Sequence, residues 1–284
     1  MVYKAQSING FTAEISASAF EELKKNPYVK SIKMEMDVKL FLQDSVPMVN
    51  ATLIFPIKVN GTNLTGNGQT VCIVDTGINY SHADLGGCLG PESSGCRVLG
   101  GYAFNNPYNT SNVTDIMDDN GHGTHVAGIV GANGSITGVA PGVNFVSAKA
   151  CGPTPACGTQ AIIDSVNWCV GNASRYNISV ISMSLGGGSY TGYCDSEDTD
   201  MTNAIDLAIA RNITVVVATG NAGLTTQISW PACIRNSTAV SSTTKADAIS
   251  SFSNRNNITT VLAPGSNITS TSKNGGTEIN SGTS

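Results

Sequence analysis

The chain has 284 residues, a length that accommodates one large domain and a small additional unit. Charged residues make up only 12% of it and the formal net charge is -5, which argues against a nucleic-acid-binding protein. No apolar run reaches the roughly 18 residues needed to span a bilayer, and residues 1–4 lack the charged-then-apolar profile of a signal peptide.

Cysteines and asparagine sequons indicate the compartment. Of the eight cysteines, Cys88 with Cys96 and Cys151 with Cys157 lie close together around turn residues. No Cys-x2-Cys pair occurs, so these spacings favour short disulfide-closed loops over zinc. The chain also holds thirteen Asn-x-Ser/Thr sequons, whose glycosylation the sequence leaves open. Together these features predict an extracellular or cell-surface protein.

Residues 1–42 differ in texture from the rest of the chain. Residues 11–15 alternate like a strand, and the capping box from Ser18 to Glu21 predicts a short helix through Lys25 that Asn26-Pro27 ends. An alternating strand is then predicted from Val29 to Val38. We interpret this region as half of a small α+β unit, separate from residues 43–284.

Beyond it, residues 43–68 show little periodicity and are expected to form a surface arm. Strand-like runs then alternate with helical patterns. The predicted strands are residues 70–74, 145–150, 180–183, 213–218, 239–242 and 260–263, and the predicted helices residues 124–131, 162–170 and 201–209. This alternation predicts a doubly wound α/β domain with a mostly parallel sheet.

Two of the three histidines, His122 and His125, lie where a polar loop gives way to the small-residue helix. Histidine titrates near neutral pH, so His122 at this helix N-terminus is a candidate general base. Asp75 follows a buried strand, at the sheet edge where functional residues collect in parallel sheets. The alternatives are a helical metal pair, structural histidines, and a turn aspartate. The HExxH pattern of metalloproteases is absent, so we expect no zinc site.

Five sequence blocks carry a specific resemblance. They are Asp75-Thr76-Gly77, Gly121-His122-Gly123-Thr124-His125-Val126-Ala127-Gly128, Ser182-Met183-Ser184-Leu185-Gly186-Gly187, Thr219-Gly220-Asn221-Ala222-Gly223 and Ser281-Gly282-Thr283-Ser284. In their order along the chain they resemble the blocks of the subtilisin-like serine proteases, the subtilases. Each block stands at a strand end or a loop of the right kind.

The resemblance implies roles for individual residues. Asp75, His122 and Ser284 resemble the aspartate, histidine and serine of the family's triad, in the chain order Asp, His, Ser. Asn221 resembles the side-chain donor of the oxyanion hole, with the Ser284 backbone N–H as its partner.

The resemblance also implies a substrate-binding surface. Ser184-Leu185-Gly186 resembles the strand that pairs with an extended polypeptide substrate. Ser229 and Trp230 resemble the wall of the primary specificity pocket, whose small neutral floor near Ser229 would favour apolar side chains.

Family resemblance also bears on the cysteines. Cys194 is expected to pair with Cys233, which leaves Cys72 and Cys169. Because both lie in apolar runs, we expect buried thiols.

The resemblance extends to both ends of the chain. Residues 1–42 resemble the second half of an inhibitory propeptide, which would make the chain's own propeptide an intramolecular inhibitor. We expect self-cleavage between about Lys39 and Ser45. The family continues beyond the nucleophile with a buried helix, so the chain as given is expected to be poorly stable and inactive.

Calcium is the one cofactor that the resemblance raises, since the chemistry itself requires none. Asp44 and Asp84 match two ligand positions of a structural calcium site, but loop 131–136 is shorter than the loop that wraps that site. The alternative is that both carboxylates are simply solvated.

The leading hypothesis is a secreted serine endopeptidase made as a self-processed proenzyme. One alternative is a non-catalytic subtilase-like surface or binding module, against which the presence of all four residues Asp75, His122, Asn221 and Ser284 argues. A metal-dependent hydrolase using His122 and His125 would be sensitive to chelators and indifferent to serine-directed reagents.

Overall fold

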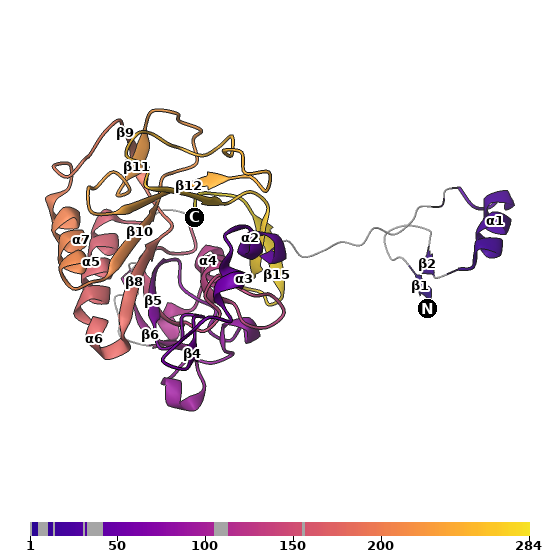
Figure 1. Cartoon of the computed structure of the whole chain (residues 1–284), viewed down its shortest axis with the longest axis horizontal. Coiled ribbons are helices and arrows are strands. Elements are labelled where there is room, and N and C mark those ends of the chain that lie inside the picture. Colours follow the sequence, from indigo (N-terminus) through magenta and orange to yellow (C-terminus); the bar gives the residue numbers. More distant parts are fainter. Residues whose placement is uncertain are drawn as a thin grey trace. The chain divides into compact units, whose positions relative to one another are not determined.

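The computed structural model describes residues 2–4, 11–13, 15–30, 32, 42–104, 113–154 and 157–284. The chain divides into two compact units, Met1–Lys39 and Leu40–Ser284, called unit 1 and unit 2 below. Figure 1 shows the elements of each. The two units are described separately.

The described residues of unit 1 form a short hairpin and a helix. Strands β1 (Val2–Lys4) and β2 (Phe11–Ala13) pair antiparallel, and α1 spans Ala17–Lys25. The helix begins earlier than predicted, because the Ser16 side chain and not that of Ser18 accepts the N–H of Ala19 and caps it. The strand predicted from Val29 to Val38 lies mostly outside the described residues.

Unit 2 is built on a seven-stranded sheet in which every pair of neighbours is parallel. In spatial order its strands are β13 (Val261–Pro264), β12 (Thr238–Thr243), β10 (Thr214–Ala218), β8 (Ile178–Met183), β5 (Thr70–Asp75), β7 (Asn144–Lys149) and β6 (Val98–Ala103). In chain order, β6 and β7 lie on one side of β5, and the strands of the sheet from β8 onward lie on its other side. This topology confirms the predicted doubly wound α/β fold.

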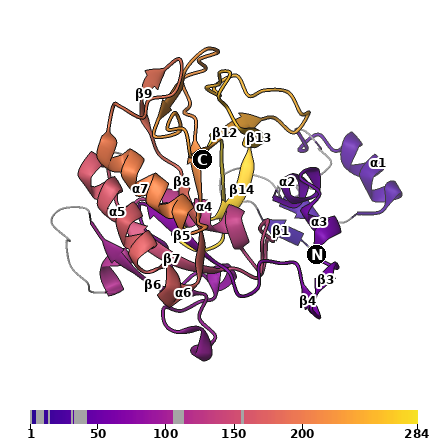
Figure 2. The ribbon, with the colours of Figure 1, turned by 60° about the vertical axis from the view of Figure 1, so that its left-hand side comes forward.

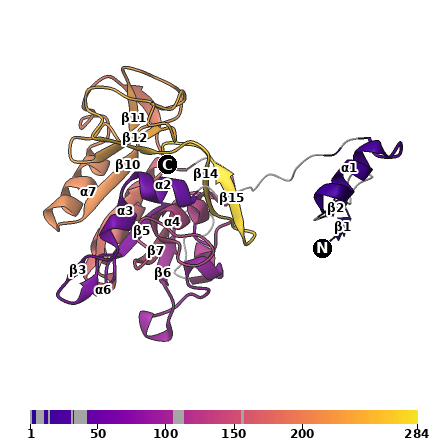
Figure 3. The same ribbon diagram turned by 45° about the vertical axis from the view of Figure 1, so that its right-hand side comes forward.

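Helices cover both faces of this sheet, as Figures 1 and 3 show for α7 and α4. On one face lie α5 (Thr159–Gly171), α6 (Ala173–Tyr176) and α7 (Thr199–Ala210), and on the other α4 (His122–Gly131). Alternate β5 side chains divide between the two cores: Cys72 packs in the core with α5, and Ile73 in the core with α4. Burial on both faces explains why β5 is continuously apolar in sequence.

Strand β6 was not predicted. Its sequence includes Gly100 and Gly101, which interrupt the apolar run. A Cβ at Gly101 would lie 2.2 Å from the Ser147 carbonyl oxygen, so the close pairing of β6 with β7 demands glycine there. Gly101 of β6 is therefore required by packing, although glycine has a low strand propensity.

The segment predicted as a surface arm contains two helices, α2 (Leu42–Met48) and α3 (Ala51–Ile54), and a hairpin of β3 (Lys58–Val59) and β4 (Thr62–Asn63). It is only partly superficial, because Val46 and Ala51 are buried against Ile268. Figure 2 shows α2 beside β14. The remaining elements are β9 (Gly187–Tyr190), β11 (Ile228–Trp230), β14 (Ile268–Thr271), β15 (Thr277–Asn280), η1 (Ala83–Leu85), η2 (Glu92–Ser94) and η3 (Val113–Ile116).

All eight cysteines form disulfides. Three pairings agree with expectation: Cys88–Cys96, Cys151–Cys157 and Cys194–Cys233. The expectation of two buried thiols was wrong, because Cys72 on β5 is bonded to Cys169 on α5. Both side chains are buried in the same core, and the packing of α5 on the sheet brings them together from 97 residues apart.

Among the described helices, none is both long and apolar enough to cross a membrane.

Candidate active site

The carboxyl ends of three neighbouring strands converge on one cavity. Asp75 is the last residue of β5, Ser184 follows β8, and Ala218 ends β10 just before Asn221. All four residues line a cavity of about 740 Å³, as do His122 and Ser284. Crevices outside the carboxyl ends of strands, at the point where strand order reverses, are the usual binding sites of open α/β sheets.

His122 is the first residue of α4. The free amides of this first turn are bonded by side chains of the preceding loops: the Thr124 N–H donates to Asp118 Oδ2 at 2.8 Å, and the Gly123 N–H donates to Thr76 Oγ1 at 2.9 Å. These bonds satisfy donors that a helix terminus otherwise leaves unpaired. They also fix the position from which the His122 side chain projects.

The imidazole of His122 is bonded to Asp75. Its Nδ1 lies 2.8 Å from Asp75 Oδ1 and 2.9 Å from Oδ2. The Asp75 carboxylate is 3% exposed and the His122 side chain 41% exposed, so the ring has one face in the protein and one open to the cavity. Because a carboxylate accepts the Nδ1 proton, Nε2 of the neutral ring is left as the basic atom.

The pKa of His122 is raised above its ordinary value. Burial alone lowers that pKa, but the hydrogen bond to Asp75, the charge of Asp75 and the charge of Asp118 together outweigh the burial. The ring is therefore a stronger base than a free histidine.

Gly123 lets α4 approach Asp75 closely. A Cβ at this position would lie 2.1 Å from the Gly77 carbonyl oxygen and 3.2 Å from the Asp75 side chain. A larger residue would displace the helix that carries His122, which explains why glycine follows His122.

Ser284 lies exposed at the same cavity. Its hydroxyl donates to the Ser184 carbonyl oxygen at 3.4 Å, and within the described residues it makes no hydrogen bond to His122. A long or absent serine-to-histidine bond is common in ligand-free sites and tightens when substrate binds.

Asn221 is held by the neighbouring Thr283. Its Oδ1 accepts the Thr283 N–H at 2.9 Å and the Thr283 hydroxyl at 3.0 Å. Because a backbone N–H can only donate, the carboxamide oxygen must face Thr283, which leaves the Nδ2 protons for another acceptor. A Cβ at Gly282 would lie 3.5 Å from Asn221 Nδ2 and 3.6 Å from the Ser284 backbone nitrogen, so the two donors flank one point.

The predicted substrate-binding residues all line the cavity: Ser184, Leu185, Gly186, Ser229 and Trp230. Residues 184–186 form no strand in the structure and lie between β8 and β9. Ser229 is only 7% exposed and stands with Trp230 on β11.

Two buried residues of the site were missed by the sequence analysis. The Asp118 carboxylate accepts five hydrogen bonds, from the N–H groups of Asn120, Gly121 and Thr124 and the hydroxyls of Thr76 and Thr124. The N-cap of α4 is Gly121, three residues after Asp118, so no capping pattern marked Asp118 in the sequence.

The second residue is Lys149, which is buried at the end of β7. Its ammonium donates to the carbonyl oxygens of Thr76 at 2.6 Å and Met117 at 3.0 Å, and pairs with Asp119 at 2.8 Å. It thereby joins the loop after Asp75 to the loop before His122. No sequence pattern distinguished it from any other lysine at the end of a strand.

His125 has different surroundings. It is 4% exposed, its Nε2 lies 3.2 Å from the Ile268 carbonyl oxygen, and burial lowers its pKa. Within the described part of the chain, no three His, Cys, Asp or Glu side chains cluster as metal ligands would.

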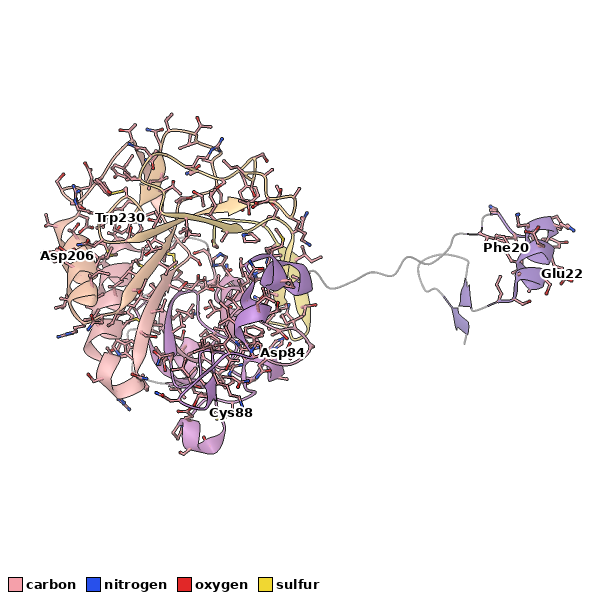
Figure 4. The ribbon with its side chains drawn as sticks, viewed as in Figure 1. Phe20, Glu22, Asp84, Cys88, Asp206 and Trp230 are labelled. Atoms are coloured by element: carbon pink, nitrogen blue, oxygen red, sulfur yellow. A yellow bond between two sulfur atoms is a disulfide. The ribbon has the colours of Figure 1, made fainter. Side chains whose placement is uncertain are left out.

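Hydrogen-bond donors hold the carboxylate of Asp84, one of the two predicted calcium ligands. The carboxylate accepts the N–H and hydroxyl of Ser135 and the N–H of Ile136. Burial raises the pKa of Asp84, but these hydrogen bonds outweigh it and hold that pKa below the ordinary value. Calcium takes about six to eight oxygen ligands, so an ion here would have to share this carboxylate with the donors. The side chain of Asp44 lies outside the described residues, and Figure 4 shows Asp84 well separated from Trp230 of the cavity.

Comparison with known proteins identifies the family. The model of the subtilase family, peptidase S8, matches residues 66–284. Alkaline serine exoprotease A of Vibrio alginolyticus is 34% identical over 98% of the chain and 49% of its own length. Subtilisin E of Bacillus subtilis is 32% identical over 98% of the chain and 67% of its own length.

A solved structure agrees. A cold adapted subtilisin-like serine proteinase superposes with a TM-score of 0.64 and 35% identity, covering 80% of this chain and 74% of that one. The chain therefore belongs to the subtilase family. It spans about half the length of the Vibrio protease.

Proposed function

We propose that the protein is a serine endopeptidase that hydrolyses polypeptides through an acyl-enzyme. The observation that carries this proposal is the bond of His122 Nδ1 to the buried Asp75 carboxylate, at the edge of a cavity that Ser284 and Asn221 also line. Family membership supports it, because a relative named as a serine exoprotease aligns over 98% of the chain.

The proposal assigns roles to four residues. Ser284 Oγ attacks the peptide carbonyl carbon while His122 Nε2 takes its proton, and His122 returns that proton to the leaving amine. Asp75 keeps the Nδ1 proton in place and stabilises the imidazolium. The Asn221 carboxamide and the Ser284 N–H donate to the oxyanion, consistent with the free Nδ2 protons of Asn221.

The substrate is a polypeptide with an extended segment. Residues 184–186 offer backbone groups on one side of the cavity, outside any strand, which suits pairing with an extended chain. Ser229 and Trp230 are uncharged, so a specificity pocket that they wall favours apolar side chains next to the cleaved bond. Glu197 and Asp198 also line the cavity.

The proenzyme and export belong to the same proposal. Residues 1–42, which include unit 1, are interpreted as the inhibitory propeptide of the domain that follows, with self-cleavage between about Lys39 and Ser45. Four disulfides fit an oxidising compartment outside the cell. Structural calcium is not proposed at Asp84.

Peptide hydrolysis by matched variants tests the proposal. Ser284→Ala is expected to abolish acyl-enzyme formation, and Asn221→Ala to lower kcat with little change in KM. The loss of about 10²–10³ in kcat found for such a donor in subtilisin, a relative of this protein, sets the scale. Full activity of folded Ser284→Ala would reject the proposal.

A further inference from the structure

Asparagine sequons are too frequent in this chain for its composition. Thirteen of its 27 asparagines are followed two positions on by serine or threonine, although these two residues make up only 58 of the 284 positions. Independent placement would give fewer than half as many sequons. The structure separates those explained by the fold from those that are not.

The backbone explains several of the asparagines. Six non-glycine residues of the described chain have positive φ, and five of them are sequon asparagines: Asn50, Asn60, Asn177, Asn212 and Asn267. Asparagine tolerates this left-handed conformation better than most residues do. The conformation gives no reason, however, for a hydroxyl two residues later.

At other sequons the hydroxyl has a structural task. Ser135, after Asn133, donates to Asp84, and Thr259, after Asn257, accepts the N–H of Asn256. Thr269, after Asn267, is buried. These sequons need no further explanation.

Asn177 and Asn236 donate to Gly68 and Asp206, and Thr65, after Asn63, is half-buried. Among the described residues, three sequons have both side chains exposed and without a side-chain hydrogen bond. Asn50, Asn60 and Asn212 are exposed and make no side-chain hydrogen bond among the described residues, and the same holds for their partners Thr52, Thr62 and Thr214. Asn50 precedes α3, Asn60 is in the β3–β4 turn, and Asn212 follows α7. None of them lines the active-site cavity, so a bulky group on any of them leaves that cavity open.

We propose that Asn50, Asn60 and Asn212 are acceptors of N-linked oligosaccharide. The four disulfides support this, because N-glycosylation and disulfide formation both belong to exported chains. The carboxamide nitrogen bonds to the anomeric carbon of a lipid-phosphate-linked oligosaccharide. The bond from that carbon to the phosphate oxygen breaks with its electron pair on the phosphate, and one amide proton passes to a base of the transferring enzyme.

Two further sequons serve as internal negative controls. Asn79 and Asn172 are half-buried, and their Nδ2 atoms donate to the carbonyl oxygens of Lys273 and Trp168, each at 2.9 Å. An oligosaccharide on either nitrogen would crowd a half-buried site and disturb this hydrogen bond. We expect both to be unmodified.

The test is mass spectrometry of the protein purified from the cells that naturally produce it. Glycopeptides fragmented by electron transfer keep the bond between asparagine and sugar. Sugar mass is expected on the peptides of Asn50, Asn60 and Asn212, and on neither Asn79 nor Asn172. Thr52→Ala, Thr62→Ala and Thr214→Ala should each remove only their own modification, while the threonine-to-serine variants retain it. Unmodified peptides at all three sites, or sugar on Asn79 or Asn172, would overturn the proposal.

Discussion

At the scale of residues, the basicity of His122 depends on two carboxylates. Asp75 bonds the ring directly, whereas Asp118 acts on it through charge and holds the helix turn from which the ring projects. The hydrogen bond and charge of Asp75 and the charge of Asp118 raise the pKa of His122, so the imidazolium persists to higher pH than in a free histidine.

Asp118→Asn should therefore shift the acid limb of the kcat/KM profile. The neutral imidazole is the active form, and removing a charge that raises its pKa moves the limb to lower pH. Measuring kcat/KM from acid to neutral pH checks this, with Asp119→Asn as the matched variant, since Asp119 is paired with Lys149 and is not among the charges that raise the pKa of His122. An unmoved limb in Asp118→Asn, or an equal movement in Asp119→Asn, would contradict this assignment.

At the scale of elements, the loop from Asn133 to Ile136 is tied down by Asp84. Removing the Ser135 hydroxyl leaves the buried carboxylate short of one donor, which should cost about 1–3 kcal/mol of unfolding free energy. The loss should be full above pH 3.8, the ordinary pKa of the group, because the folded pKa is lowered, and it should vanish as the pH falls through that lowered value.

Denaturant unfolding of Ser135→Ala, in calcium and in chelator, checks both points. We expect the same decrement in the two buffers, because hydrogen-bond donors surround Asp84. A decrement present only with calcium would show that the carboxylate binds the ion.

The disulfide between β5 and α5 should contribute more than the short ones. In the chain-entropy model a link across 97 residues stabilises by about 4–5 kcal/mol, whereas one across 8 residues stabilises by about 2–3 kcal/mol. Unfolding of the double alanine variant at Cys72 and Cys169 should therefore lose more free energy than that at Cys88 and Cys96. An equal or smaller loss would contradict the entropic argument.

At the scale of the whole molecule, the sequence predicted the sheet and its main helices because both give strong periodic signals. Burial of β5 produces a short apolar run, and burial of one face of α5 and of α7 produces a helical apolar pattern. Both signals lie within a short stretch of sequence and can be recognised there. Strand β6 and the bond between Cys72 and Cys169 depend on contacts between distant segments. Such contacts cannot be predicted from patterns within a short stretch of sequence.

The same distinction holds within the site. The positions of Asp75, His122, Ser284 and Asn221 along the chain could be recognised from the motifs around them. Asp118 and Lys149 could not, because their importance comes from buried hydrogen bonds to loops that only the fold brings together.

Self-processing is a prediction about the two units together. An active preparation should contain a cut between about Lys39 and Ser45, located by sequencing the new N-terminus, whereas Ser284→Ala should remain a single chain. Adding a little active enzyme to the variant distinguishes a missing nucleophile from an inaccessible junction. An active protein that stays uncut would contradict the proenzyme interpretation.

The measurement that tests the central claim most directly is fluorophosphonate labelling followed by peptide mapping. This reagent phosphonylates a serine that a neighbouring base has activated and spares ordinary hydroxyls. We predict label on Ser284 in the protein as its own cells produce it, none in its Ser284→Ala variant, and much less in its His122→Ala variant. A folded protein that takes up no label, or takes it up at another residue, would contradict the assignment of Asp75, His122 and Ser284 as a catalytic triad.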